Sequence, residues 1–552
     1  KRGRERRAEK STRKVIVTMA AIERALWSCF TVLLLVSVSA TNSFSDNSSQ
    51  QDGTATTTDF TGLYMVLSNK AAGIFFENAV INTMGAVKDF PLNQGKAASK
   101  HIFGVDEWET NLVMSNIVLK SIKSATVDNE FQFTEPSGFT LGLTNVEADV
   151  FFNYNVTAPY VGYPGDATLM FEKLRLDIDI QLPANEIKIQ SLKISENPGV
   201  LAYDISNGVW DDILNMLATD MKSFITDKTL DTMSPKLQAI VQLMASNIKK
   251  QIPVYKALKL DVDWPSAVTL KNEKFMMIPM KGNFLTSKTT VTPKTTLPTP
   301  TIDIQSSDDV QAYVSDFSLE SLFLVTAADQ PLVLPPTPLE IPGFATVTTK
   351  SENFRDLFPP VGGNAEWGKV YPDNPDVYLS VSNEGCTDAS VTIDETDYIT
   401  ANTSLLFSVY VKAEDSKDEP TKAVTVKVPM KLTQLELVAE NSTISSKLNG
   451  SVTFTGDFTS IYTVSEDLKL DLATMKTKWN TQLTGIIKLF ISSLKHDFKE
   501  VTFDKVVYQK DFAVLGGTIA SKSSESMIIK DTEHAVASEN VLKYTRMYEE
   551  LQ

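Results

Sequence analysis

The sequence predicts an α+β protein with two tandem halves, each an antiparallel sheet wrapped by helices. Three observations predict this fold. Long stretches alternate apolar and polar residues, an amphipathic helical pattern lies near the end of each half, and a Thr/Pro-rich segment separates the halves. Strict alternation turns one sheet face to the core and the other to water, which is typical of antiparallel sheets.

The composition is that of a globular protein with room for several domains. The chain has 552 residues, of which 42% are hydrophobic and 22% charged. It contains two cysteines and three histidines. These counts argue against a disordered chain, a structural zinc or iron–sulfur protein, and a disulfide scaffold.

The charge is distributed unevenly along the chain. The net charge is −16, with +6 in residues 1–40, −7 in residues 41–290 and −15 in residues 291–552. A body this acidic is a poor partner for nucleic acid or for an anionic membrane as a whole. The stretch 221–290 has eleven Lys against five Asp/Glu. It is either a contact for lipid headgroups or a solvated helix face, and we favour the second.

The N-terminus predicts a secretory signal peptide. After Met19 come a cation, an apolar run over 25–38 and small residues before a candidate cleavage site at Ala40. We therefore expect residues 1–40 to be an upstream segment and signal peptide, with 1–18 as upstream translated sequence. An uncleaved anchor is the alternative. This predicts a secreted protein or one in the secretory-pathway lumen, and cleavage would leave Cys386 as the one cysteine.

Five Asn-x-Ser/Thr sequons fit a secreted glycoprotein, although such short motifs also arise by chance. The candidate glycosylation sites are Asn47, Asn155, Asn402, Asn441 and Asn449.

A connector rich in threonine and proline divides the chain. Eight of the sixteen residues in 286–301 are Thr and three are Pro, which favours an extended linker. The predicted domains are a first half at 41–285, a linker at 286–305, a second half at 306–520 and a polar tail at 521–552.

Each half repeats one order of elements. The first half has a helical pattern over 64–80, then alternating strands, of which 174–182 is the clearest. An amphipathic helix follows from residue 210, is interrupted at Ser234-Pro235 and resumes over 237–248. The second half has a shorter helix over 317–323, an alternating strand over 424–432 and an amphipathic helix over 475–494. Each helix-wrapped sheet either encloses a ligand tunnel or is simply filled by its own side chains.

Four segments in this order resemble a known family. They are KAAGIFF at 70–76, MIPMKGNF at 277–284, DVQAYVSDF at 309–317 and VVYQKDFAVLGG at 506–517. The chain resembles, over about 59–520, the family of bactericidal/permeability-increasing protein, lipopolysaccharide-binding protein and cholesteryl ester transfer protein, in the tubular lipid-binding superfamily. The resemblance implies a boomerang of two β-barrels that a central sheet joins, with an apolar pocket for acyl chains in each barrel.

Two departures from the family narrow the expected function. Mammalian members carry a disulfide in the N-terminal barrel, and this chain lacks the cysteine pair. The bactericidal member is basic at its N-terminal tip, whereas this half is acidic. Because basic side chains neutralise clustered phosphates, the charge weakens a lipopolysaccharide-recognising antimicrobial function, which stays an alternative.

No catalytic constellation is visible. The sequence has no Gly-x-Ser-x-Gly elbow, phosphate-binding loop or His-Glu-x-x-His pattern. We interpret the remaining candidates as structural: the three histidines as surface residues, Cys386 as a small hydrophobe, Asp177 and Asp179 as a solvent-facing pair, and the asparaginase-like stretch 516–521 as a strand end. We expect no enzyme, no metal and no cofactor.

We therefore expect a monomeric lipid-binding and lipid-transfer protein that contacts membranes transiently and holds phospholipid acyl chains. A non-transferring structural glycoprotein is the other alternative. The residues expected to line the pockets are Tyr64, Leu67, Ala71, Phe75, Leu174, Leu176, Ile178, Ile180, Leu214, Leu217, Met221, Phe224, Phe317, Leu322, Met475, Trp479, Leu483, Ile486 and Phe490.

Overall fold

The structure is a computed structural model that describes the following residues of the chain. These are 60–76, 88–103, 109–122, 131–158, 161–196, 201–205, 218–246, 250–255, 257–329, 331, 333, 336–338, 347–363, 365–396, 398–412, 419–440, 443–479, 495–497 and 501–519.

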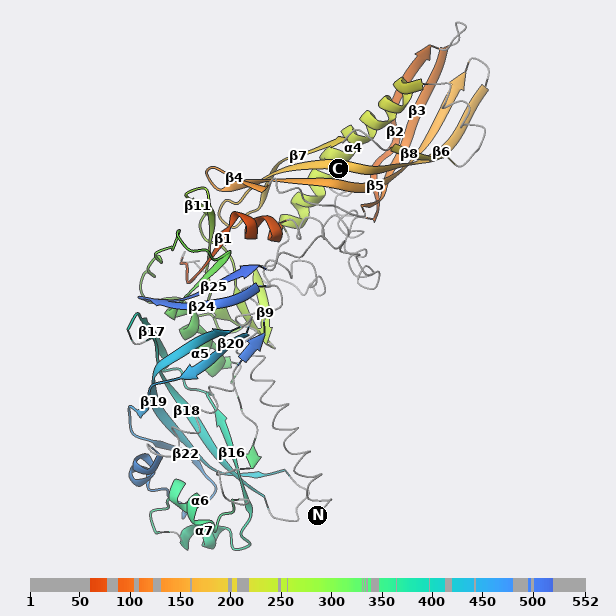
Figure 1. Ribbon diagram of the computed structural model, residues 1–552. Coiled ribbons are helices and arrows are strands. Elements are labelled where there is room, and N and C mark those ends of the chain that lie inside the picture. The colour runs from red at the N-terminus through yellow and green to blue at the C-terminus, as the bar shows by residue number, and fades with distance from the viewer. Residues whose placement is uncertain are drawn as a thin grey trace.

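The fold is mixed and sheet-rich, with few helices, and the molecule is elongated and bent (Figure 1). A sheet of the first half lies at one end, a central sheet lies in the middle and a sheet of the second half lies at the other end (Figure 1). All the strand pairs described are antiparallel, as the alternating sequence pattern predicts.

The sheet of the first half is formed in the order β2-β3-β5-β6-β7, with β4 on β5 and β8 on β6. Its strands are β2 (Lys88–Phe103), β3 (Glu109–Ile122), β4 (Phe131–Thr134), β5 (Gly138–Ala158), β6 (Val161–Gln181), β7 (Lys188–Glu196) and β8 (Leu201–Ile205). The predicted alternation holds in β6, where the even-numbered apolar residues from 174 to 180 are buried and the residues between them are partly exposed.

The sheet of the second half is formed in the order β15-β16-β18-β19-β20-β23, with β17, β21 and β22 paired beside it. Its strands are β15 (Thr337–Pro338), β16 (Asp376–Ser382), β17 (Ser390–Asp394), β18 (Tyr398–Lys412), β19 (Thr421–Glu440), β20 (Thr443–Leu448), β21 (Val452–Phe454), β22 (Thr459–Thr463) and β23 (Lys495–Asp497). Three helical segments belong to this half: α6 (Glu352–Leu357), α7 (Ala365–Val370) and residues 472–479.

The central sheet takes strands from both halves in the order β11-β12-β1-β14-β25-β24. These are β1 (Leu63–Ser68), β11 (Thr269–Lys271), β12 (Phe275–Met280), β14 (Val310–Ser315), β24 (Val501–Gln509) and β25 (Phe512–Ile519). A smaller sheet beside it contains β9 (Gln251–Tyr255), β10 (Leu258–Asp261) and β13 (Phe284–Leu285).

The two halves enter the central sheet in equivalent ways. The first strand of each half pairs with a strand near the end of the same half, β1 with β12 and β14 with β25, and β1 pairs with β14 across the middle. The first strands end at Ser68 and Ser315, and a helix follows each: residues 69–76 and α5 (Asp316–Asp329). Each serine hydroxyl accepts the N–H three residues later, at 3.1 Å. Each half therefore begins with a central strand followed by a helix.

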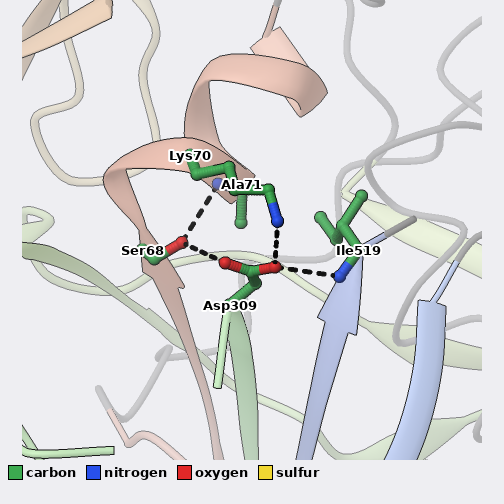
Figure 2. A network of polar contacts seen from close by, with 5 residues as sticks. All are labelled: Ser68, Lys70, Ala71, Asp309 and Ile519. Atoms are coloured by element: carbon green, nitrogen blue, oxygen red, sulfur yellow. Dashed lines mark hydrogen bonds and ion pairs between the residues drawn. The ribbon is translucent and has the colours of Figure 1, made fainter. Parts of the chain in front are cut away.

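Asp309 ties the two halves together at this junction (Figure 2). Its carboxylate accepts the Ser68 hydroxyl at 3.3 Å, the Lys70 ammonium at 2.8 Å and the Ile519 backbone N–H at 3.1 Å. One side chain of the second half thus holds the end of β1, the helix after it and the end of β25.

The helix predicted over 64–80 is wrong at its beginning. Residues 63–68 form β1, and the helix begins at residue 69. The run from Leu63 to Leu67 is buried on both faces, a pattern that a buried helix and a central strand share. Hydrogen bonds to β12 and β14, which are distant in sequence, stabilise this segment as a strand.

The predicted interruption at Ser234-Pro235 is also wrong. Helix α4 (Ala218–Ser246) runs through Pro235 without a break. A proline removes one hydrogen bond and favours a break in an isolated helix. Here the Ser234 hydroxyl donates to the Leu192 carbonyl of β7, so tertiary contacts hold the helix on both sides of the proline.

The linker is packed against the central sheet. Ile302 and Ile304 cover an apolar cluster on one face of that sheet, and the Asp303 N–H donates to the Tyr313 hydroxyl at 3.1 Å. The Gln509 side chain donates to the Thr301 carbonyl at 2.9 Å. Both halves contribute strands to the central sheet, and the domain boundaries at 285, 305 and 520 stay a prediction.

Asp316 makes the junction sensitive to pH. Burial, with a smaller contribution from the nearby Asp511 and Glu320, raises the pKa of this carboxyl from 3.8 to about 6, against the lowering effect of a hydrogen bond from the Phe317 N–H. A raised carboxyl pKa means that ionisation costs more in the folded state than in the unfolded state. The free energy of unfolding should therefore fall as the pH rises from about 4 to 6, and stay lower above pH 6.

We expect Asp316→Asn to remove that fall and to raise the free energy of unfolding at pH 7 by about 1–2 kcal/mol, after allowance for partial exposure. Urea denaturation between pH 4 and 7.5 measures it. Asp471→Asn is the control, because a hydrogen bond from Thr474 lowers the pKa of Asp471 and its effect belongs to more acidic pH. An unchanged pH slope in Asp316→Asn would contradict the prediction.

Candidate functional site

The candidate site is the apolar interior of the first half. Leu174, Leu176, Ile178 and Ile180 on β6 are at most 4% exposed and belong to the main hydrophobic core. Phe139, Leu141 and Leu143 on the paired strand β5 are fully buried beside them. These two strands build one wall.

Helix α4 builds the facing wall and covers the seam of the sheet. Strands β2 and β7 are the two ends of the sheet, and within the described part of the chain they are not paired with each other. Helix α4 packs against both of them (Figure 1). The interior is therefore closed by a helix where a complete barrel would have strand pairing.

The seam is held by polar side chains of α4 on the backbone of β7. The Gln242 amide donates to the Ile187 carbonyl at 2.8 Å and accepts the Ile189 N–H at 2.7 Å, as a neighbouring strand would. Gln238 donates to the Ile189 carbonyl at 3.4 Å, four residues earlier on the same helix face. These bonds satisfy backbone groups at the start of the edge strand β7, and they can break without opening a sheet.

The face of α4 that points inward has two chemical parts. Met233, Leu237 and Val241 are at most 6% exposed and join the main core. One turn earlier, Thr226 and Thr229 are 3% and 0% exposed. The stripe is apolar toward the central sheet and hydroxylated toward the far end of the half.

An aromatic cluster closes the interior near the central sheet. Phe76 lies 4.2 Å from Phe139, and Phe131 lies 5.0 Å from Phe139, between ring centroids. Gly73 allows this approach, since a Cβ there would lie 3.2 Å from Phe131. The helix at 69–76 thus presses directly onto these rings.

The second half has a different interior. Trp479 is 1% exposed and its ring centroid lies 5.0–5.5 Å from those of Phe358, Phe407 and Phe458. Its indole N–H donates to the Leu357 carbonyl at 2.7 Å. Trp367 is fully buried and donates to the Phe358 carbonyl at 2.8 Å. Around these indoles the second half is a packed aromatic core, and both indole N–H groups have an acceptor.

The predicted pocket residues fall into several places. Leu67, Ala71, Phe75, Leu322 and the four β6 residues lie in the main core, and Met475 and Trp479 lie in the core of the second half. Tyr64 lies in the cluster on the other face of the central sheet, and Phe317 is buried at the start of α5, 5.4 Å from Phe60. The side chains outside the described set are Leu214, Leu217, Met221, Phe224, Leu483, Ile486 and Phe490.

The candidate glycosylation sites are partly placed. Asn155 and Asn449 are exposed, while Asn402 is half-buried and donates to the Ser390 hydroxyl at 3.2 Å. Asn47 and Asn441 lie outside the described residues. Modification of these residues stays a prediction.

The described residues that were considered for catalysis have structural roles. Cys386 is 1% exposed, and burial raises the pKa of its thiol to about 11, which makes it a poor nucleophile. Asp177 accepts from Arg175 at 3.0 Å, Asp179 accepts from Ser191, and residues 516–517 lie inside β25. Among the described residues no cluster of His, Cys, Asp or Glu could hold a metal ion. The three histidine side chains lie outside this set.

Sequence reasoning missed Thr226, Thr229 and Gln242. The helical periodicity put apolar residues on the inner face of α4, and it passed over the polar residues at the same spacing. Threonine at positions i and i+3 ahead of Met233 was the available signal.

Within the described residues, no helix is long and apolar enough to cross a bilayer.

No family model and no curated protein matches the chain. Among solved structures, lipopolysaccharide binding protein is similar at 14% identity and a TM-score of 0.39, over 84% of this chain and 99% of that one. P47 of Clostridium botulinum E1 is similar at 11% identity and a TM-score of 0.22, over 84% and 100%.

A third structure, Takeout 1 of Epiphyas postvittana, is similar at 9% identity and a TM-score of 0.19, over 27% of this chain and 78% of that one. Likenesses this weak establish neither a family nor a function. The class of protein rests on the strand pairing described above: a sheet-rich α+β chain with two covered sheets and a shared central sheet.

Proposed function

We propose that this protein binds lipid acyl chains in the interior of its first half and moves lipids between membranes. One observation carries the proposal: a sheet-lined apolar interior is closed by helix α4 through side-chain hydrogen bonds rather than by strand pairing. Such a seam can separate to admit an acyl chain while every strand keeps its partners. Each buried CH₂ contributes about 0.8 kcal/mol, so a single long chain supplies most of the affinity that transfer requires.

The finer parts of the proposal come from the sequence. They are membership of the bactericidal/permeability-increasing protein family, a two-barrel boomerang, phospholipid as the cargo, and passage through the secretory pathway as a glycoprotein. The acidic charge of the first half argues for chain recognition over recognition of clustered phosphates. The packed indoles of the second half argue that the first half is the principal binding site.

Native mass spectrometry of the chain from residue 41, followed by lipid extraction, tests the function. We expect co-purified acyl lipid and uptake of fluorescent phosphatidylcholine from vesicles. A lipid-free mass together with no uptake would overturn the proposal and favour a structural glycoprotein. Selective uptake of lipopolysaccharide over phosphatidylcholine would favour the antimicrobial alternative.

A matched pair of substitutions locates the site. Met233 on α4 and Met475 in the helix at 472–479 are both about fully buried methionines on covering helices. Each Met→Trp change overfills its interior at a cost of about 1–3 kcal/mol. We expect Met233→Trp to lower phosphatidylcholine uptake about tenfold and Met475→Trp to leave it nearly unchanged. Equal uptake by both variants would contradict a site in the first half.

A further inference from the structure

Helix α4 buries two hydroxyls that the described contacts do not explain. Thr226 and Thr229 are 3% and 0% exposed, and neither hydroxyl oxygen has a hydrogen-bond partner among the described residues. Leaving a buried hydroxyl unpaired is unfavourable, so native proteins satisfy nearly all of them. Two on one helix face point to a partner that the described part of the chain does not supply.

Other helical threonines of this chain behave differently. Thr232, on the same helix, donates to the Lys228 carbonyl at 2.7 Å. Thr326 on α5 donates to the Leu322 carbonyl at 2.8 Å, and Thr477 donates to the Ala473 carbonyl at 3.1 Å. This bond to the preceding turn is the ordinary way in which a helix satisfies a threonine. Thr226 and Thr229 lack it although they are buried to a similar extent as Thr326, which is 1% exposed.

The position of the pair defines the chemistry of the missing partner. Residues i and i+3 share a helix face, and this face continues into Met233, Leu237 and Val241. The surface is therefore an apolar wall with two neutral donors at one end. None of these five residues is charged, so the wall fits a neutral acceptor on an otherwise apolar molecule and does not fit a phosphate.

We propose that Thr226 and Thr229 form a polar subsite that binds the carbonyl oxygens of an ester-linked acyl lipid. This inference rests on the proposed lipid-binding function and adds the part of the lipid that α4 recognises. The acyl chains lie along the apolar part of the stripe, and the ester carbonyls accept hydrogen bonds from the two hydroxyls. The subsite sets how deep the lipid sits.

A comparison of ester and ether lipids tests the subsite. Vesicles are prepared from diacyl phosphatidylcholine or from its dialkyl ether analogue with the same chain length and unsaturation, because the ether lacks the carbonyl oxygens. We expect the wild-type protein to take up the ester lipid about tenfold more tightly than the ether lipid, as one or two hydrogen bonds would give.

The variant Thr226→Val/Thr229→Val keeps the shape of both side chains and removes both hydroxyls. We expect it to bind the two lipids equally, while Thr232→Val, the control on the same helix, keeps the preference. The lipid-free double variant should unfold at the same temperature as wild type or higher, because it no longer buries unpaired hydroxyls.

Three outcomes separate the two proposals. A lost preference in the double variant, with lipid uptake retained, supports the subsite. Equal uptake of ester and ether lipids by the wild-type protein overturns the subsite, assigns the hydroxyls to water and leaves lipid binding in place. No uptake of either lipid overturns the proposed function itself.

Discussion

Replacing Trp479 with alanine is expected to lower the free energy of unfolding of the second half by about 3–5 kcal/mol. The side chain is 1% exposed and packs against the rings of Phe358, Phe407 and Phe458. Its removal leaves a large cavity, and it also deprives the Leu357 carbonyl of its 2.7 Å donor. Urea denaturation followed by far-ultraviolet circular dichroism measures the loss.

Two further variants separate the causes. Trp479→Phe keeps a ring in the cavity and loses the indole N–H, so we expect a cost of about 1–2 kcal/mol. Tyr462→Ala, on the exposed strand β22 of the same half, should stay within about 0.5 kcal/mol of wild type.

The Trp479→Ala result also bears on function. A loss below about 1 kcal/mol would show that this interior is loosely packed. The difference in packing between the two interiors, on which the assignment of the principal lipid site to the first half depends, would then be lost. The second half would need to be tested in the same uptake assay.

Gly282→Ala is expected to be the second severe change, at about 3–4 kcal/mol. Gly282 has a φ of 68°, where an alanine pays a steric cost. A Cβ there would also lie 3.0 Å from the Leu63 nitrogen and closer still to the Leu63 Cβ. Because Leu63 begins β1, the clash acts on the strand that joins the two halves.

Gly385→Ala is the matched control. Gly385 has the same φ of 68°, but a Cβ there would meet no atom within 4 Å. Gly385→Ala therefore carries the conformational strain alone, which costs about 1 kcal/mol. Equal losses in the two variants, measured by thermal and urea unfolding, would contradict the proposed clash at the junction.

Both predictions concern regions that were only partly visible in the sequence. The period-two pattern was sufficient to predict β6 and β19, because each alternates apolar and polar residues over a long stretch, although Ala423 and Thr425 on the second face of β19 are buried as well. The short helix after the linker was also predicted, and α5 confirms it. The pattern failed for Leu63–Ser68, where both faces are buried and period carries no information.

The candidate site shows the same division. The apolar residues of β6 were predicted to line an interior, and they are in the main core. The role of Gln242 could not be predicted. In the sequence it is one polar residue of a helix, and only the tertiary structure brings its amide to the backbone of Ile187 and Ile189, where a neighbouring strand would bond. Tyr64 and Leu67 were assigned to one helix face, but alternation in β1 sends them to opposite faces of the central sheet.

The sequence by itself determined a mixed, sheet-rich fold with antiparallel strands and the apolar faces of the long strands, since these depend on local periodicity and composition. The tertiary structure alone decided which strands pair in the central sheet, where α4 closes the first half, and which interior is filled by indole rings. Those features depend on contacts between residues tens to hundreds of positions apart, such as Ser68 with Asp309 and Trp479 with Leu357. Such contacts leave no periodic trace in one chain.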